Sequence, residues 1–204
     1  MAKHIIVQAR TPGDRKDFPT LFIMSGPRFL PAAFGANVGK VMRSLFRYKR
    51  NLFSFEHVRF VKVNGENAGM YLSYDRKVKD EEEARTVDLL LRYMGEEQFT
   101  AQLPHLLWMS SVFGAMEDDA FYLSNMAVYP EFRDMGLGTS LLLDIEETCR
   151  KLGAKSIAED VETDNEGSIR LYKRMGYSII GEPRGTVING EEFSFFRMCK
   201  DISP

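Results

Sequence analysis

The strongest constraint on the fold of this chain is a strand-turn-helix segment in its second half, MAVYPEFRDMGLGTSLLLDIEE. A strand pattern ends near Val128 and an apolar helical pattern begins near Thr139, with Gly136 and Gly138 just ahead of it. Glycine tolerates positive φ and lets the backbone approach a ligand closely. The first N–H groups of a helix have no partner within the helix and carry a partial positive charge. The segment therefore predicts either a plain strand-to-helix turn or a cradle for a phosphate group.

Two common phosphate-binding loops do not match this segment. A P-loop needs Gly-Lys-Ser/Thr where the helix begins, whereas here Gly138 is followed by Thr139 and Ser140. The dinucleotide-binding fingerprint needs a third glycine, and this chain has Leu141 at that position. If the glycine turn holds an anion, it does so in another kind of site.

The rest of the pattern predicts a single α/β domain over residues 1–204. The first half reads as a strand, two helices and a hairpin that turns at Asn64-Gly65. Residues 25–35 read as a loop, and residues 79–119 as a mainly helical insertion broken at Pro104. Strands and helices then alternate and end in two strands, which favours a mixed sheet with some parallel pairing.

Charge and composition exclude several classes of function. The net charge is −2, so no basic surface for nucleic acid is expected. The longest apolar runs are too short to cross a bilayer, and the first residues lack a signal-peptide pattern, so we expect a cytoplasmic protein without a membrane partner. His4, His57, His105 and the two cysteines lack metal-ligand spacing, so no metal is expected.

Two linked motifs point to a known family. The pattern V-x-P-x-x-R-x-x-G-x-G fits VYPEFRDMGLG, residues 128–138. Downstream, DVETDNEGSIRLYKRMGY has Asn165, Leu171, Tyr172, Gly176 and Tyr177 at matching places. Together they resemble the acetyl-CoA signature of the GNAT superfamily of N-acetyltransferases, and the order of elements agrees. The resemblance implies a central twisted mixed sheet flanked by helices, here with a helical insertion.

The resemblance also implies how acetyl-CoA, the co-substrate, is held. In this family the strand before the glycine turn splays from the next parallel strand, and pantetheine lies in the gap. Backbone groups of Met126 and Val128 are expected to pair with pantetheine, and the N–H groups from Arg133 to Thr139 with the pyrophosphate. The expected cofactor-contact residues are Met126, Ala127, Val128, Arg133, Asp134, Met135, Gly136, Leu137, Gly138, Thr139, Asn165, Ser168 and Tyr172.

The family assigns two proton-transfer roles to positions in this chain. Tyr172 occupies the position of the general acid that protonates the leaving thiolate; the alternative is a tyrosine that only packs and bonds to the cofactor. Asp160 occupies a position where some members carry a glutamate that acts as the general base; the alternative is that Asp160 is only a solvated carboxylate. Glu159 is expected on the opposite face of its strand from Asp160. Further base candidates on the preceding strand are Tyr122, Ser124 and Asn125.

The acceptor is the least defined part of the prediction. We expect a primary amine of a small molecule or of a peptide N-terminus. The resemblance to the GNAT superfamily implies that residues 25–37 and 182–192 contribute to its pocket. The insertion either caps the acceptor pocket, forms a homodimer face or enlarges the core, and we expect Leu107 and Trp108 to help line the acceptor side. The alternatives are a non-catalytic acyl-CoA-binding sensor domain and an N-acyltransferase that uses a different acyl donor.

Overall fold

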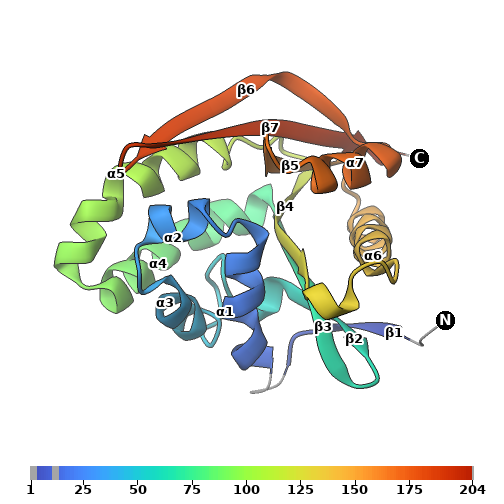
Figure 1. Ribbon diagram of the computed structural model, residues 1–204, viewed down its shortest axis with the longest axis horizontal. Coiled ribbons are helices and arrows are strands. Elements are labelled where there is room, and N and C mark those ends of the chain that lie inside the picture. Colours follow the sequence, from blue (N-terminus) through green and yellow to red (C-terminus); the bar gives the residue numbers. More distant parts are fainter. Residues whose placement is uncertain (1–3, 11–13, 204) are drawn as a thin grey trace.

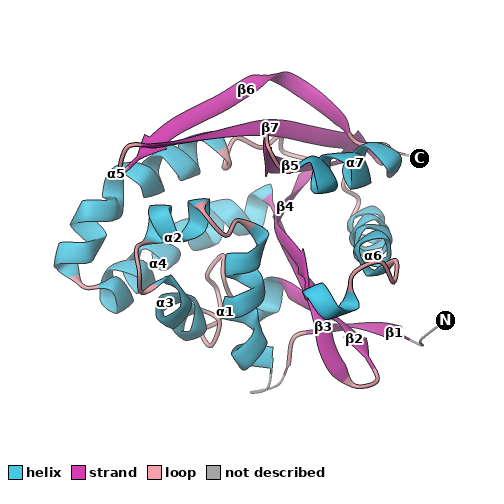
Figure 2. Cartoon of the chain, in the orientation of Figure 1, coloured by secondary structure: helices cyan, strands magenta, loops and turns pink. Residues whose placement is uncertain are grey.

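The computed structural model describes residues 4–10 and 14–203, and their strands form one seven-stranded sheet (Figures 1 and 2). The strand order is β1-β2-β3-β4-β5-β7-β6. The strands are β1 (His4–Gln8), β2 (Val58–Val63), β3 (Glu66–Asp75), β4 (Ala120–Val128), β5 (Ser156–Glu162), β6 (Ser178–Ile188) and β7 (Glu191–Asp201). The α-helices are α1 (Asp14–Ser25), α2 (Phe29–Phe34), α3 (Val38–Leu45), α4 (Arg76–Met94), α5 (Glu96–Val112), α6 (Leu137–Lys151) and α7 (Glu166–Arg174), and the 3₁₀ turns are η1 (Phe55–His57) and η2 (Pro130–Phe132).

The sheet is mixed, as the sequence predicts. Among the described strands, β4 and β5 run parallel and every other neighbouring pair is antiparallel. The β2–β3 hairpin turns at Asn64 and Gly65, with φ values of +50° and +88°. Asn189 and Gly190 turn the β6–β7 hairpin with φ values of +53° and +81°. Positive φ at both turn positions suits the right-handed twist of the strands, which explains the Asn-Gly pairs.

Helices cover both faces of the sheet, so each face has its own apolar core. Figure 1 shows α1 to α5 on one side of β4 and α6 on the other. Successive side chains on a strand point to opposite faces. Met70 and Leu72 of β3 therefore pack with the α1–α5 core, while Tyr71 between them packs with the core under α6. Within the described residues, no helix has the length and apolar character needed to cross a membrane.

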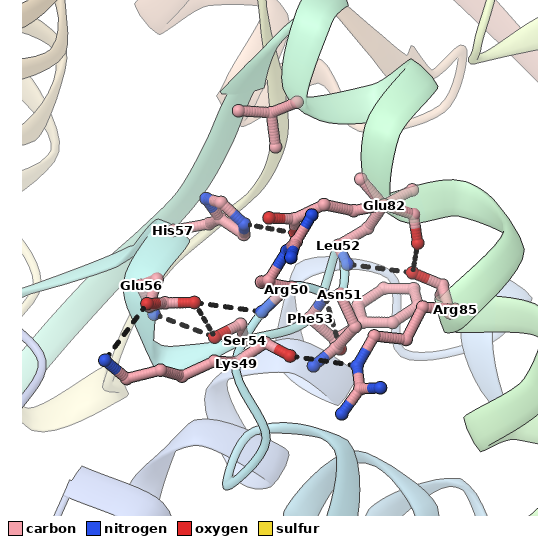
Figure 3. A network of polar contacts seen from close by, with 12 residues as sticks. Lys49, Arg50, Asn51, Leu52, Phe53, Ser54, Glu56, His57, Glu82 and Arg85 are labelled. Carbon is pink, nitrogen blue, oxygen red and sulfur yellow. Dashed lines mark hydrogen bonds and ion pairs between the residues drawn. The ribbon is translucent and has the colours of Figure 1, made fainter.

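A polar network fixes the segment between α3 and β2 against α4 (Figure 3). The Asn51 side-chain amide donates to the carbonyl oxygens of Leu45 and Tyr48, at 3.1 and 2.7 Å. His57 Nε2 lies 2.8 Å from Glu82 Oε2, and both side chains are largely buried. The Asn51 bonds hold this segment to the end of α3, and the His57–Glu82 contact joins the first half of α4 to η1, just before β2.

The structure differs from the sequence prediction at three helices. Helix α2 lies where a loop is predicted. Its proline, Pro31, falls in the first turn, where backbone N–H groups make no hydrogen bond within the helix, so the proline costs the helix nothing there. Helix α5 runs through Pro104, and the break comes earlier, at Gly95, whose φ is +82°. Helix α6 begins at Leu137, two residues earlier than expected, so Gly138 belongs to its first turn.

Candidate active site

Strands β4 and β5 separate partway along their length. They pair from Ala120↔Ser156 to Tyr122↔Ala158, whereas β4 continues to Val128 and β5 to Glu162. The other edge of β4 stays paired with β3 as far as Val128. Near the point of separation, Ser124 is an extra residue in the β3–β4 register, between Asn125 and Leu123. Such a bulge bends its strand, which accounts for the divergence of β4 from β5.

The glycine turn forms a backbone cradle at the start of α6. Gly136 precedes the helix with a φ of +77°, and Asp134 has a φ of +61°. No side chain caps this helix end, so the N–H groups of Leu137, Gly138 and Thr139 have no helical partner. A Cβ built on Gly138 would lie 3.1 Å from Leu171 Cδ2, so a glycine here lets α7 pack close to the cradle.

These residues fit the diphosphate and pantetheine arm of coenzyme A. The helix end presents uncapped N–H groups and a partial positive charge to solvent, and residues 133–136 are exposed. Met126, Ala127 and Val128 are half-buried on the part of β4 that β5 leaves unpaired. An extended chain in that gap would meet free backbone groups of both strands.

Helix α7 brings Asn165, Ser168 and Tyr172 to the same gap. Asn165 caps the helix, because its Oδ1 accepts from Ser168 N at 3.1 Å. All three residues line one cavity together with Met126. The structure therefore assembles β4 and α7 around a common space, although nearly 40 residues separate Met126 from Asn165 in the sequence.

The phenol of Tyr172 is buried beside the carboxyl group of Glu159, the residue expected on the opposite face of β5 from Asp160. Burial raises the pKa of Tyr172 well above its usual value, and the neighbouring Glu159 carboxyl adds to the rise. Burial also raises the pKa of Glu159, which favours its protonated form, while the Tyr172 hydroxyl acts in the opposite direction. Among the described residues, Glu159 Oε1 has no hydrogen-bond partner.

Asp160 is held by two arginines. Arg184 reaches one carboxylate oxygen at 2.6 Å, and Arg197 reaches both oxygens at 3.0 and 2.8 Å. The Tyr122 hydroxyl donates to Asp160 Oδ2 at 3.1 Å. The Asp160 side chain is 1% exposed, so the carboxylate is not solvated. Both carboxylate oxygens are already engaged by guanidinium groups and neither is open to an incoming amine, so this geometry disfavours the predicted base role.

The same arginines hold the end of α5. Arg184 donates to the Val112 carbonyl oxygen at 3.0 Å, and Arg197 donates to those of Val112 and Ala115 at 2.8 and 2.6 Å. Arginines at a helix C-terminus satisfy its free carbonyl groups and oppose its partial negative charge. Sequence reasoning missed this cluster, because Asp160 meets Arg197 only through the β5–β7 register.

The cavity continues from Tyr172 into the helical side of the molecule. Its volume is about 420 Å³. Leu107, expected on the acceptor side, lines it; Trp108 packs behind it against Phe29 and Phe113, which also line it. Asn125 of β4 closes one wall, where its amide donates to Ser25 Oγ of α1 at 2.8 Å. Within residues 4–10 and 14–203, no group of three His, Cys, Asp or Glu side chains is placed to hold a metal ion.

Comparison with known proteins places most of the chain in the family that its two motifs resemble. Residues 41–177 match the model of the Acetyltransferase (GNAT) family. The chain is 34% identical over 58 residues to the uncharacterized N-acetyltransferase YdgE of Bacillus subtilis. That match covers 28% of this chain and 37% of YdgE, so the chain spans little more than a third of this relative.

Solved structures show the same fold at low sequence identity. An N-acetyltransferase from Staphylococcus aureus Mu50 superposes with a TM-score of 0.70 at 18% identity, covering 96% of this chain and all of that one. A Bacillus subtilis acetyltransferase in complex with CoA superposes with a TM-score of 0.53 at 14% identity, covering 98% and 99% of the two chains. The seven-stranded mixed sheet is therefore an acetyltransferase fold.

Proposed function

This chain is a member of the Acetyltransferase (GNAT) family, and from that membership we propose that it transfers the acetyl group of acetyl-CoA to a primary amine. The observation that carries the proposal is that Met126, beside the gap between β4 and β5, and the buried Tyr172 line one cavity, while α7, which carries Tyr172, packs against the uncapped start of α6. The acceptor is an amine of a small molecule or of a peptide N-terminus.

The cradle and the strand gap bind the co-substrate in this proposal. The N–H groups at the start of α6 hold the diphosphate, and backbone groups of Met126 and Val128 pair with the pantetheine arm. Asn165 and Ser168 lie at the wall near the reacting end. Acetyl-CoA supplies an acyl thioester, whose carbonyl carbon is open to attack by an amine.

Tyr172 is the proton donor in this proposal. Attack by the amine nitrogen forms the amide C–N bond and breaks the C–S bond, so the departing sulfur needs a proton or a hydrogen bond. The raised pKa keeps the Tyr172 phenol protonated across the neutral range, so its O–H is available to the sulfur. The amine must arrive uncharged or lose a proton in the site.

We assign Asp160 a structural role, in which it holds Arg184 and Arg197, rather than the role of the base that removes the proton of the acceptor amine. Both of its oxygens are engaged by guanidinium groups, and a water would have to displace one of them to reach the carboxylate. The proposal therefore leaves the amine proton to solvent within the cavity.

Thiol release from acetyl-CoA tests the proposed reaction, with a panel of amino acids, polyamines, aminoglycosides, peptide N-termini and simple alkyl amines as acceptors. Tyr172→Phe should lower turnover at saturating substrates by at least tenfold while CoA affinity, measured by calorimetry, changes little. CoA binding without thiol release from any acceptor would favour the sensor alternative. Faster turnover with succinyl-CoA or a longer acyl-CoA would favour the different-donor alternative.

A further inference from the structure

The cavity beside Tyr172 extends far beyond the space that an acetyl group needs. One end of the cavity lies at Tyr172 and Met126. The other end lies at Phe34, Leu90 and Phe99, which belong to α2, α4 and α5, helices that do not contribute to the cradle. Its walls come from α1, α2, α4 and α5 as well as from β4. Because reaction site and helical chamber are one continuous space, a molecule whose amine reacts at Tyr172 can place the rest of its body in the chamber.

Helix α5 gives this chamber an apolar wall without closing it. None of the α5 residues is buried, although the helix carries several large apolar side chains. Five of these α5 side chains line the cavity, together with Val87 of the facing helix α4; the five are Phe99, Leu103, Leu106, Leu107 and Met109. Leu107 is 60% exposed and Val87 is 43% exposed, so apolar surface also rims the opening. An apolar guest would remove this surface from water, which is favourable in proportion to the area covered.

The polar side chains on the α4–α5 wall already have partners. Lys79 Nζ lies 3.3 Å from Glu83 Oε2, and Ser110 donates to the other oxygen of Glu83. Thr86 donates to the Glu82 carbonyl oxygen and accepts from Leu52 N. A guest that places hydroxyl or ammonium groups against this wall would give up water there and compete with pairs that are already formed, which is costly.

We infer that the acceptor is a monoamine with an apolar alkyl or aromatic body, held in the chamber with its amine directed to Tyr172. The inference rests on the proposed function and adds the chemical class of the substrate. Polyamines and aminoglycosides are poor acceptors on this view, because each carries further charges into the apolar part.

The binding of matched amines to the wild-type protein tests directly whether the chamber prefers an apolar monoamine. The chain has a single tryptophan, Trp108, and its ring packs on Phe29 and Phe113 of the cavity wall, so its fluorescence reports occupancy. Hexylamine should bind about 15-fold more tightly than butylamine, at roughly fourfold per added methylene. 1,6-Diaminohexane, equally long but with a second charge, should bind at least tenfold more weakly than hexylamine. Equal binding of the two six-carbon ligands would overturn the inference.

A pair of variants on one helix locates the binding site. Leu103→Trp fills the chamber and should weaken hexylamine binding at least tenfold while CoA affinity stays the same, with both affinities measured by calorimetry because the variant adds a second tryptophan. Ala101→Trp adds the same ring to an exposed position of α5 and should change neither affinity. Hexylamine binding that is unchanged in a folded Leu103→Trp variant would overturn the inference; if this variant does not fold, the comparison of ligands on the wild type decides.

Turnover separates this inference from the proposed function. Chain-length-dependent binding without acetylation of any amine would overturn the proposed function and leave the chamber assignment intact. Acetylation of spermidine in preference to hexylamine would overturn the inference and support the proposed function. Preferred turnover of hexanoyl-CoA over acetyl-CoA, abolished by Leu103→Trp, would show that the chamber holds the acyl chain and would overturn the inference.

Discussion

Replacing Asp160 with alanine should destabilise the protein strongly and leave its chemistry largely intact. The carboxylate is 1% exposed and accepts three charge-assisted hydrogen bonds, of 2.6 to 3.0 Å, from Arg184 and Arg197. The Arg197 side chain is 12% exposed, so Asp160→Ala leaves a largely buried guanidinium without its anion. Removing one partner of a buried ion pair costs about 3–5 kcal/mol. Arg184 is 32% exposed and can recover water, which places the loss near the lower end of that range.

Urea denaturation of Asp160→Ala measures this loss. A reduction of about 3 kcal/mol, with a slope of about 2 kcal/mol per molar urea, lowers the midpoint by roughly 1.5 M. The matched control is Asp164→Ala: Asp164 pairs with Arg28 at 3.0 Å, but its side chain is 65% exposed. An exposed pair contributes up to about 1 kcal/mol, so the control midpoint should move by at most about 0.5 M.

Kinetics under native conditions then decide between the two roles of Asp160. On our reading, folded Asp160→Ala keeps kcat within a few-fold of wild type. KM for the acceptor rises, because the arginines that hold the end of α5 lose their anchor. A midpoint close to that of the wild type, together with a fall in kcat of a hundredfold or more, would contradict a purely structural role and restore Asp160 as the base.

Three further predictions address other parts of the molecule. Gly136→Val should lower the free energy of unfolding by about 1–2 kcal/mol, because a β-branched residue is strained at the φ of +77°. The variant should also bind CoA at least tenfold more weakly, and unchanged CoA binding in calorimetry would contradict the cradle assignment. Glu159→Gln should become more stable relative to wild type as pH rises from about 4.3, because the unfolded glutamate then loses its proton while the folded one, whose pKa burial raises, keeps it. The free energies of unfolding of the two proteins, from urea denaturation at pH 5 and 7, should diverge by up to about 1.4 kcal/mol per pH unit, and a constant difference would contradict this prediction. Glu82→Ala should cost about 2–3 kcal/mol of stability, because it removes the hydrogen-bond partner of the largely buried His57 in the network of Figure 3; an unchanged thermal unfolding midpoint would show that α4 does not depend on this contact.

The features that sequence reasoning anticipated depend on local backbone chemistry. The hairpin turn at Asn64-Gly65 and the positive φ of Gly136 each follow from a few neighbouring residues. Long-range features did not follow from such patterns. The pairing of Asp160 with Arg197 requires the β5–β7 register, which joins residues 37 positions apart. Pro104 suggested a helix break, but the flanking turns of α5 carry the helix past the one backbone bond that proline removes.

The same division between local and long-range contacts explains why the cofactor side of this site is easier to assign than the acceptor side. The cradle consists of backbone groups whose positions depend on Gly136 and on the start of α6, so a short motif specifies it. The chamber consists of side chains from four helices that meet only in the folded chain, and none of its members belongs to a motif. Related chains can therefore keep the cradle while the chamber changes, and the acceptor must be deduced from the shape and polarity of the chamber. Here those properties favour an apolar body, because the polar side chains on the α4–α5 wall are already paired with protein groups.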